Sequence, residues 1–487
     1  MRPHYWAPIA DAACSSGAAP IQPFCGTPLS THKEPRSAPH EVSTRAVGDG
    51  ADAPRRALGL PALVCLMFLV VSGGAYGLED AVRIGGPKLV LILCIVVPMT
   101  LSLPSALMAG ELTALMPVEG GFYFWVKRAL GPFAGFAEAY LTILYTAVDM
   151  AIYPVLFAAY LSFIVPVGPL GQVAIGIGVV WLSGLLNIAG VRPVGEASIA
   201  LAIIVLAPFI AMVVLGFGKI EHFAMPTAPM FGADPMGALG GALIVVIWNF
   251  GGWENLSVVS AEIKNPRRNY IRAIAIAMPI IVAGYLLPLA VCLSGATGAA
   301  NWREGWFAHA GARLGGPILG AALAIGGSVM AFAVFEAGML WVSRMPFVLA
   351  REGYLPAPLR EVWSTTATPV KAIVASCVVF TLLIPLGFVA LVVLDVFFYM
   401  AALALEMAAL VRWRALAPKR PGRFTVGGGR VGLWLTAALP LVTWIATFAL
   451  ALGAGGAQRD FMIAIALSVS VWPAYAIARR RWGGPTT

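Results

Sequence analysis

Two acidic residues lie deep within long apolar stretches, where an ionised group needs a reason to be buried. Asp149 has Tyr145 four residues before it and Tyr153 four residues after it, so the three side chains share one face of a helix. A carboxylate between two phenol rings can hold an ammonium group through charge and cation–π contact. The alternative is a carboxylate stabilised only by the two hydroxyls. Glu336 stands in the middle of "VMAFAVFEAGMLW" with no basic residue within one helical turn.

Two other stretches place glycines and polar residues inside apolar runs. "VVSGGAYGLEDA" (70–81) contains Ser72, Gly73 and Gly74, and "WNFGGWEN" (248–255) contains two adjacent glycines. Glycine adopts backbone angles that other residues avoid, so both stretches predict unwound helix. Unwound backbone at membrane depth is tolerated only where protein or water satisfies its N–H and C=O groups. For either stretch alone, a glycine packing seam between helices is the alternative.

The elements that carry these residues are membrane spans. Hydrophobic residues make up 60% of the chain and charged residues only 11%, with a mean hydropathy of +0.86. A soluble chain of 487 residues needs far more charge to cover its surface. Several uncharged runs reach the roughly 20 residues that cross a bilayer as helix. We predict twelve spans, near residues 58–82, 89–115, 132–165, 169–190, 193–217, 236–262, 272–294, 315–343, 369–386, 389–411, 431–453 and 460–478.

The basic residues predict the orientation of these spans. Of the 32 Lys and Arg residues, 26 fall on the same side as the N-terminus and 6 on the other side. Loops rich in Lys and Arg stay inside, so we expect both termini in the cytoplasm and the protein in the cell membrane. For residues 1–56 we predict a disordered cytoplasmic tail, or a start codon placed too early. For residues 480–487 we predict a short cytoplasmic C-terminal tail.

Other functional classes find little support. The net charge of +9 follows from topology, so we expect no nucleic-acid partner. The cysteines and histidines show no ligand spacing, and we expect no metal and no cofactor. The membrane region lacks a phosphate-binding loop, H-E-x-x-H and G-x-S-x-G, so we expect no enzyme. A polytopic membrane enzyme or a channel remains a remote alternative.

The two glycine-rich interruptions fall in the first and sixth predicted spans, five helices apart. Such a pair at matching positions of two halves indicates an inverted-repeat transporter with a site at the bilayer midplane. Half-helix N-termini then direct N–H groups at an anionic group of the substrate, and we expect these donors from Ser72, Gly73 and Gly74. We predict an all-α polytopic protein with a ten-helix 5+5 core over residues 57–415, and helices 11 and 12 over 416–479.

Four stretches then make the chain recognisable: "SGGAYGLED" (72–80), "SLPSALMAGELTALMPVEGGFYFWVKRALGPFAGF" (102–136), "WNFGGWENLSVVSAEIKNPRRNY" (248–270) and "FFYMAALALEMAALVRWR" (397–414). They resemble the amino acid–polyamine–organocation (APC) superfamily, which has the LeuT-like inverted-repeat fold. "GLEDAVRIGGP", "VDMAIYPVLFAAYL" and "FYMAALALE" look closest to plant-type polyamine uptake transporters, and more distantly to L-type amino acid transporters. The resemblance implies a secondary active transporter that imports polyamines or amino acids by alternating access, coupled to protons.

The resemblance also implies roles for single residues. It places Glu336 against the substrate cavity. The position of Trp248 resembles that of a gating tryptophan in the arginine/agmatine antiporter, and Glu254 matches a glutamate tied there to proton-linked closure. Tyr399 either gates the site or binds neighbouring helices. The predicted substrate-binding residues are Ser72, Gly73, Gly74, Asp149, Tyr153, Trp248, Asn249, Phe250, Gly251, Glu336 and Tyr399, with Glu254 for proton coupling.

The acids favour a cationic substrate. Asp149 and Glu336, with no basic residue in the central portion of either span, would repel each other across a shared cavity, and a dication would relieve that repulsion. Putrescine or spermidine comes first, and a basic amino acid next. The glycine break also suits an amino acid carboxylate, so a neutral or other amino acid permease or exchanger is the alternative. Symport against exchange, the coupling ion and the oligomeric state stay open.

Overall fold

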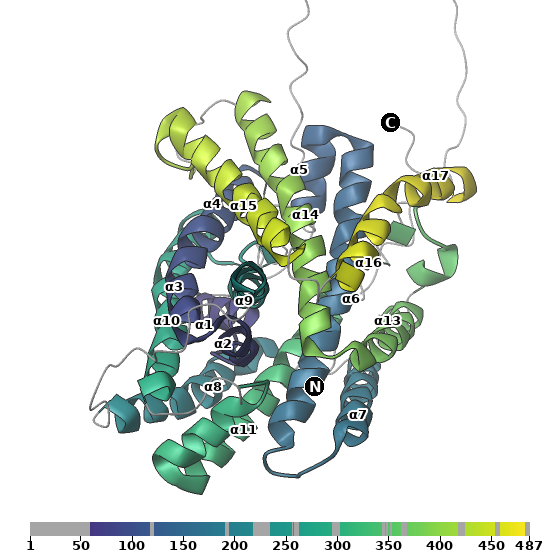
Figure 1. Ribbon diagram of the computed structural model, residues 1–487. Coiled ribbons are helices and arrows are strands. Elements are labelled where there is room, and N and C mark those ends of the chain that lie inside the picture. Colours follow the sequence, from purple (N-terminus) through teal and green to yellow (C-terminus); the bar gives the residue numbers. More distant parts are fainter. Residues whose placement is uncertain are drawn as a thin grey trace, which may run out of the picture. The chain divides into compact units, whose positions relative to one another are not determined.

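The computed structural model describes residues 59–116, 121–189, 194–217, 234–255, 257, 263–294, 302–342, 346, 349–350, 353–361, 368–416, 424–452 and 458–482. Every regular element within these residues is a helix (Figure 1). The predicted N-terminal tail, and residues 483–487 of the C-terminal tail, lie outside the described part of the chain.

The helices follow one another in the order that the apolar runs predict. They are α1 (Leu60–Val71), α2 (Glu79–Gly85), α3 (Pro87–Val97), the π-helical turn Pro98–Ser102, α4 (Leu103–Leu115), α5 (Gly121–Leu130), α6 (Pro132–Leu161), α7 (Pro169–Ile188), α8 (Val194–Phe217), α9 (Pro235–Phe250), α10 (Pro266–Ser294), α11 (Trp306–Val342), the 3-10 turn Ala357–Arg360, α13 (Val370–Leu383), the 3-10 turn Ile384–Leu386, α14 (Phe388–Leu416), α15 (Gly429–Leu452), α16 (Gln458–Val469) and α17 (Val471–Trp482).

The described helices account for the twelve predicted spans. Within the described residues, nine helical stretches are long and apolar enough to cross a membrane, and three shorter apolar helices occupy the remaining positions. The shorter ones are α1, α9 and Val370–Leu386. Two of these three, α1 and α9, are the first halves of the spans for which the sequence predicts a break. The all-α, polytopic fold class predicted from the sequence is confirmed.

Glycine backbone angles explain where the two broken spans stop. After α1 ends at Val71, Gly73, Gly74 and Gly77 adopt φ values of 61°, 95° and 91°, and helix resumes only at Glu79. After α9 ends at Phe250, Gly252 has a φ of 84°. A side chain with a Cβ is disfavoured in this left-handed region, so the glycines permit both breaks.

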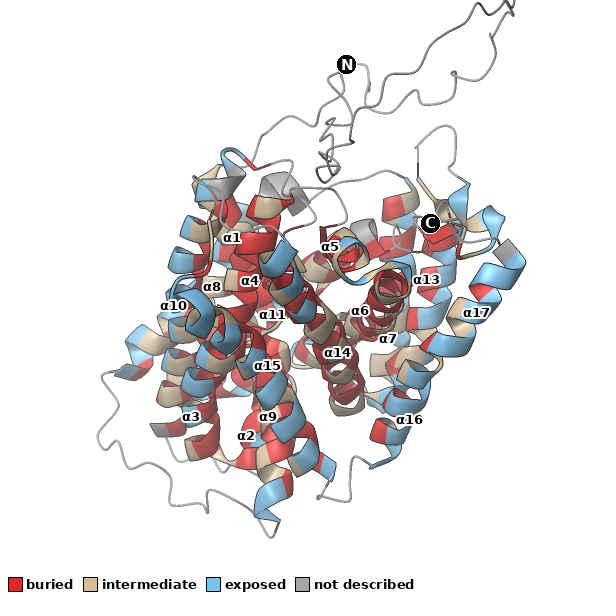
Figure 2. Ribbon diagram, turned by 90° about the horizontal axis from the view of Figure 1, so that it is seen from above, coloured by how far each residue is buried: buried red, intermediate tan, exposed pale blue. Residues whose placement is uncertain are grey.

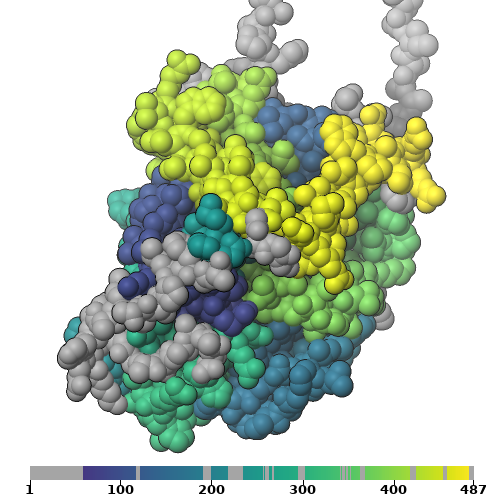
Figure 3. Space-filling view, viewed as in Figure 1, coloured from purple at the N-terminus to yellow at the C-terminus, as the bar shows by residue number. Residues whose placement is uncertain are grey.

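The helices at the centre of the bundle are buried, and the peripheral ones turn large apolar side chains outward. Helix α6 packs against both α14 and α11, and Figure 2 shows α6 and α14 largely buried. In contrast, Val214, Leu382 and Trp472 are 68%, 72% and 66% exposed. An outer surface of this kind suits lipid contact. Figure 3 shows α15, α16 and α17 on the surface of the molecule, with α15 yellow-green and the last two helices yellow.

Candidate functional site

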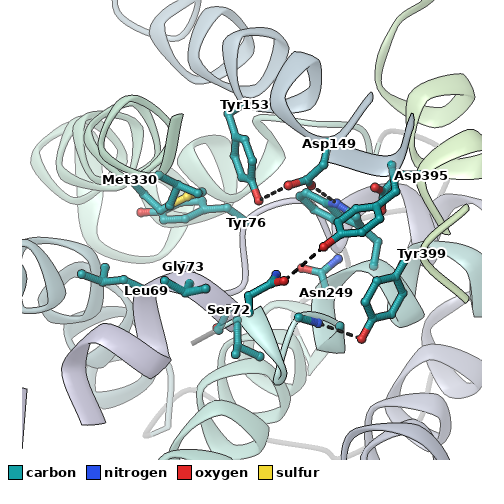
Figure 4. A pocket seen from close by; sticks show the side chains of 18 residues that line it. Leu69, Ser72, Gly73, Tyr76, Asp149, Tyr153, Asn249, Met330, Asp395 and Tyr399 are labelled. Carbon is teal, nitrogen blue, oxygen red and sulfur yellow. Dashed lines mark hydrogen bonds between the residues drawn. The ribbon is translucent and has the colours of Figure 1, made fainter. Parts of the chain in front are cut away.

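A pocket lies where the two helix breaks meet the central helices (Figure 4). The first break contributes Ser72 and Gly73, and α11 contributes Met330. The second break and the end of α9 form another part of the wall. Helices α6 and α14 supply further polar side chains, including one acid each. Residues from five separate parts of the chain therefore converge on one cavity.

Most of the predicted binding residues come together there. The lining includes Ser72, Gly73, Asp149, Tyr153, Trp248, Asn249, Gly251 and Tyr399. Gly74, Phe250 and Glu336 are not part of it. Gly74 instead faces Phe209 and Val205 of α8, and a Cβ at Gly74 would lie 3.1 Å from each of these side chains.

Phe250 and Glu336 point away from the pocket for different reasons. The Phe250 ring is 1% exposed and packs edge-on against Tyr285, with 4.8 Å between the ring centroids. The Glu336 carboxylate turns toward α7, where it accepts hydrogen bonds from Ser183 Oγ and, at 2.8 Å, from Asn187 Nδ2. The expectation that Glu336 faces the substrate cavity is therefore not met, because α7 supplies neutral donors for both of its oxygens.

Asp149 is held at the pocket wall by two aromatic donors. Trp248 Nε1 donates to Asp149 Oδ1 at 3.0 Å, and the Tyr153 hydroxyl donates to Asp149 Oδ2 at 3.3 Å. The hydroxyl of Tyr145 bonds elsewhere, to Asn255 Oδ1 at 3.2 Å. The alternative in which two tyrosine hydroxyls stabilise this acid therefore holds for Tyr153 only, and Trp248 takes the second place.

Asp395 is a second acid in the same pocket, and it is absent from the set predicted above. It lies on α14, is 5% exposed, and its Oδ1 has no hydrogen-bond partner among the described residues. Asp395 and Asp149 interact electrostatically. None of the lining residues that the structure describes is basic. The sequence does hold a signal for it, because Asp395 precedes Tyr399 by four residues, as Asp149 precedes Tyr153.

The backbone donors expected at the first break are already occupied. The N–H groups of Ser72 and Gly73 both donate to the Phe68 carbonyl, at 2.9 and 3.0 Å, and so complete the last turn of α1. The N–H of Gly74 donates to Ser72 Oγ at 3.1 Å. The expectation that these three residues offer free N–H groups is not met in this structure.

Trp248 lies between the two halves of the site. A Cβ at Gly77 would lie 2.6 Å from the Trp248 ring, so the glycine leaves the room that the indole occupies. On another side the ring meets Phe388 edge-on, with 5.5 Å between the centroids. Trp248 therefore contacts both the first break and α14 at the pocket wall.

Glu254 lies behind the pocket wall and is connected to it through Tyr399. The Tyr399 hydroxyl accepts from the Gly252 N–H at 3.0 Å and donates to Glu254 Oε2 at 3.1 Å. Glu254 is 2% exposed and does not line the pocket. This hydrogen-bonded chain joins the pocket, the second break and a buried acid.

Comparisons with known proteins agree with this architecture. The family model described as "Amino acid permease" matches residues 58–472. Polyamine transporter PUT1 of Oryza sativa subsp. japonica is 30% identical over 97% of this chain and 87% of its own length. Polyamine transporter RMV1 of Arabidopsis thaliana is 30% identical over 85% of this chain and 86% of its own length.

A solved structure shares the fold. The crystal structure of MhsT in complex with L-phenylalanine superposes with a TM-score of 0.59 at 11% identity, covering 82% of this chain and 99% of that one. The broken helices, the apolar spans and the family match have one explanation. The chain is a multi-pass membrane transporter that belongs to the amino acid permease family of the APC superfamily.

Proposed function

We propose that this transporter imports polyamines, with short diamines as preferred substrates. The observation that supports this most is the pair of acids, Asp149 and Asp395, in one pocket whose described lining holds no basic residue. Two carboxylates in one buried cavity repel each other, and a diammonium ion neutralises both at once. The rings of Tyr153 and Trp248 beside Asp149 offer further attraction for a cation.

The three predicted donors of the first break argue against an amino acid whose carboxylate they would bind. Recognition of a carboxylate there needs free N–H groups, as anion sites at helix termini have. In this structure Ser72, Gly73 and Gly74 use theirs within the chain. A substrate without a carboxylate does not need them. The similarity to two proteins named as polyamine transporters supports the same choice.

The proposed mechanism is proton-coupled symport by alternating access in the cell membrane, with both termini in the cytoplasm. The two breaks divide each broken span into halves that can tilt independently around a central site. Trp248 gates the pocket, since it contacts both the first break and α14. Glu254 takes the proton, and the Tyr399 hydroxyl relays its state to the Gly252 backbone of the pocket wall.

The test is uptake of labelled putrescine into proteoliposomes, with and without an inward proton gradient. Unlabelled putrescine, spermidine, arginine, leucine and glutamate compete in parallel. We expect putrescine and spermidine to compete best, and the gradient to drive accumulation. Strongest competition by leucine would replace the polyamine substrate by a neutral amino acid, and uptake indifferent to the gradient would remove the proton from the mechanism.

A further inference from the structure

The interface between α6 and α14 carries a second set of acids beyond the pocket. Glu138 precedes Asp149 on α6 by eleven residues, and Glu406 follows Asp395 on α14 by eleven residues. Eleven residues make about three helical turns, so the two acids of each helix share a face and lie about 16 Å apart along it. Each helix thus presents one acid at the pocket and one farther along the same face.

We call this row of side chains the ladder. It occurs on both packed helices, in opposite sequence directions. Tyr145 and Tyr399 each lie four residues from the pocket acid and seven from the distant acid of their helix. Their rings meet edge-on, with 5.7 Å between the centroids. Asp149 interacts electrostatically with Asp395, and Glu138 with Glu406. Along the helix axes, the interface therefore contains one pair of acids, then the pair of tyrosines, then the second pair of acids.

Glu254 from the second break joins the distant pair. It interacts electrostatically with Glu138 and with Glu406, and it accepts the Tyr399 hydroxyl at 3.1 Å. The second set therefore comprises three acids from three parts of the chain: Glu138, Glu254 and Glu406. One of them, Glu254, is connected to the pocket wall by its hydrogen bond with Tyr399.

Two of these acids have unused hydrogen-bonding capacity in a dry place. Glu138 is 0% exposed and Glu406 is 3% exposed. Glu138 accepts the Thr142 hydroxyl at 3.1 Å on one oxygen, but its Oε2 and the Oε2 of Glu406 have no partner among the described residues. Buried oxygens of this kind are rare in stable structures unless an ordered water, a ligand or an ion completes them. The unmet oxygens point to a cationic occupant.

We propose that Glu138 and Glu406, beside the proton-binding Glu254, form a second cation site, which receives an ammonium group of the substrate after it leaves the pocket. This rests on the proposed function, a cationic substrate. The Tyr145–Tyr399 pair separates the two sites, and its ring faces attract the ammonium group as it passes. The second site lies toward the first turns of α6, the end that the basic-residue distribution predicts to face the cytoplasm. The ladder is therefore the release path of an importer.

The test compares binding with translocation in the Glu138→Gln/Glu406→Gln double variant. Equilibrium binding of labelled putrescine to purified protein reports on the pocket. Exchange of labelled for unlabelled putrescine across proteoliposomes at equal pH reports on passage without a proton gradient. Gradient-driven uptake is measured beside them. We expect binding within about twofold of wild type and exchange slowed by about tenfold or more.

Two single variants calibrate the double variant. Glu336→Gln removes a buried acid outside the ladder and should bind and exchange like wild type. Asp395→Asn removes an acid of the pocket and should lose binding itself. Exchange at the wild-type rate in the double variant would overturn the second site. Loss of gradient-driven uptake with exchange intact would overturn it too, because the acids would then serve protons alone.

Loss of binding in the double variant would show that these acids shape the pocket and would likewise overturn a separate site. Failure of the proposed function looks different. There, the wild-type protein itself would not bind or exchange putrescine, whatever the variants do.

Discussion

Asp395 and Glu336 are both buried acids on central helices, yet their surroundings are opposite. The Glu336 carboxylate is 1% exposed and is completed by Ser183 and Asn187 of α7. The Asp395 carboxylate is 5% exposed, lines the pocket and leaves Oδ1 without a partner in the described structure. Burial without a basic neighbour does not by itself mark a binding residue. We propose that unmet hydrogen-bonding capacity beside a cavity is the distinguishing property.

The largest expected effect is on the acid with unmet capacity. Asp395→Asn keeps the shape of the side chain but removes the charge and half of the acceptor capacity. Hydrogen bonds to charged groups contribute about 1.5–3 kcal/mol, so we expect putrescine affinity to fall by about 10- to 100-fold. Equilibrium binding to purified protein measures this. Wild-type affinity in Asp395→Asn would remove this acid from the binding site.

The next largest effect is expected where a buried acid loses its hydrogen-bond donor. Tyr399→Phe deletes the hydroxyl that serves both the Gly252 N–H and Glu254 Oε2. Leaving buried groups unpaired costs about 1–3 kcal/mol each, so the melting temperature in detergent should fall, and uptake should slow with it. Tyr145→Phe is the matched control, because among the described residues its hydroxyl bonds to Asn255 alone, and it should destabilise less. Equal destabilisation by the two variants would contradict the bridging role of Tyr399.

Features that depend on local sequence were predictable. The spans follow from apolar length, and the breaks follow from glycines whose backbone angles other residues avoid. Asp149 could be singled out because the tyrosines that mark it lie on its own helix. In each case the interacting residues lie within a few turns of one another.

Features that depend on which helices become neighbours were not predictable in the same way. Helical periodicity shows which residues share a face with Glu336, but not that this face meets α7. Asp395 becomes a candidate only through its interaction with an acid on α6, which is distant in the sequence. The prediction of free N–H groups at the first break was also wrong, because the Phe68 carbonyl, one helical turn earlier, accepts hydrogen bonds from two of them.

An acid outside the spans should give an effect of intermediate size. Glu304 lies in the segment before α11, and burial, together with its neighbour Asp80, raises its pKa to about 7. Between the ordinary glutamate pKa and about 7, the folded chain keeps a proton that the unfolded chain has lost. Stability should therefore fall as pH rises through this window and level off above it. Melting temperatures across the window measure this, and Glu304→Gln should flatten the curve; an unchanged slope in that variant would assign the pH dependence to another group.

The smallest effect should come from the acid whose needs are fully met. Glu336→Gln keeps the shape, retains one acceptor oxygen for Asn187 and gains an amide that can donate to the Ser183 hydroxyl. The variant also removes a charge that is costly to bury, which offsets the weaker hydrogen bonds. We expect putrescine affinity like that of wild type, and a free energy of unfolding changed by less than about 1 kcal/mol. Binding assays beside Asp395→Asn make the measurement. If Glu336→Gln lost affinity as strongly as Asp395→Asn, Glu336 would reach the substrate in another conformation of the transport cycle, and satisfied hydrogen bonding in one conformation would not separate structural acids from binding ones.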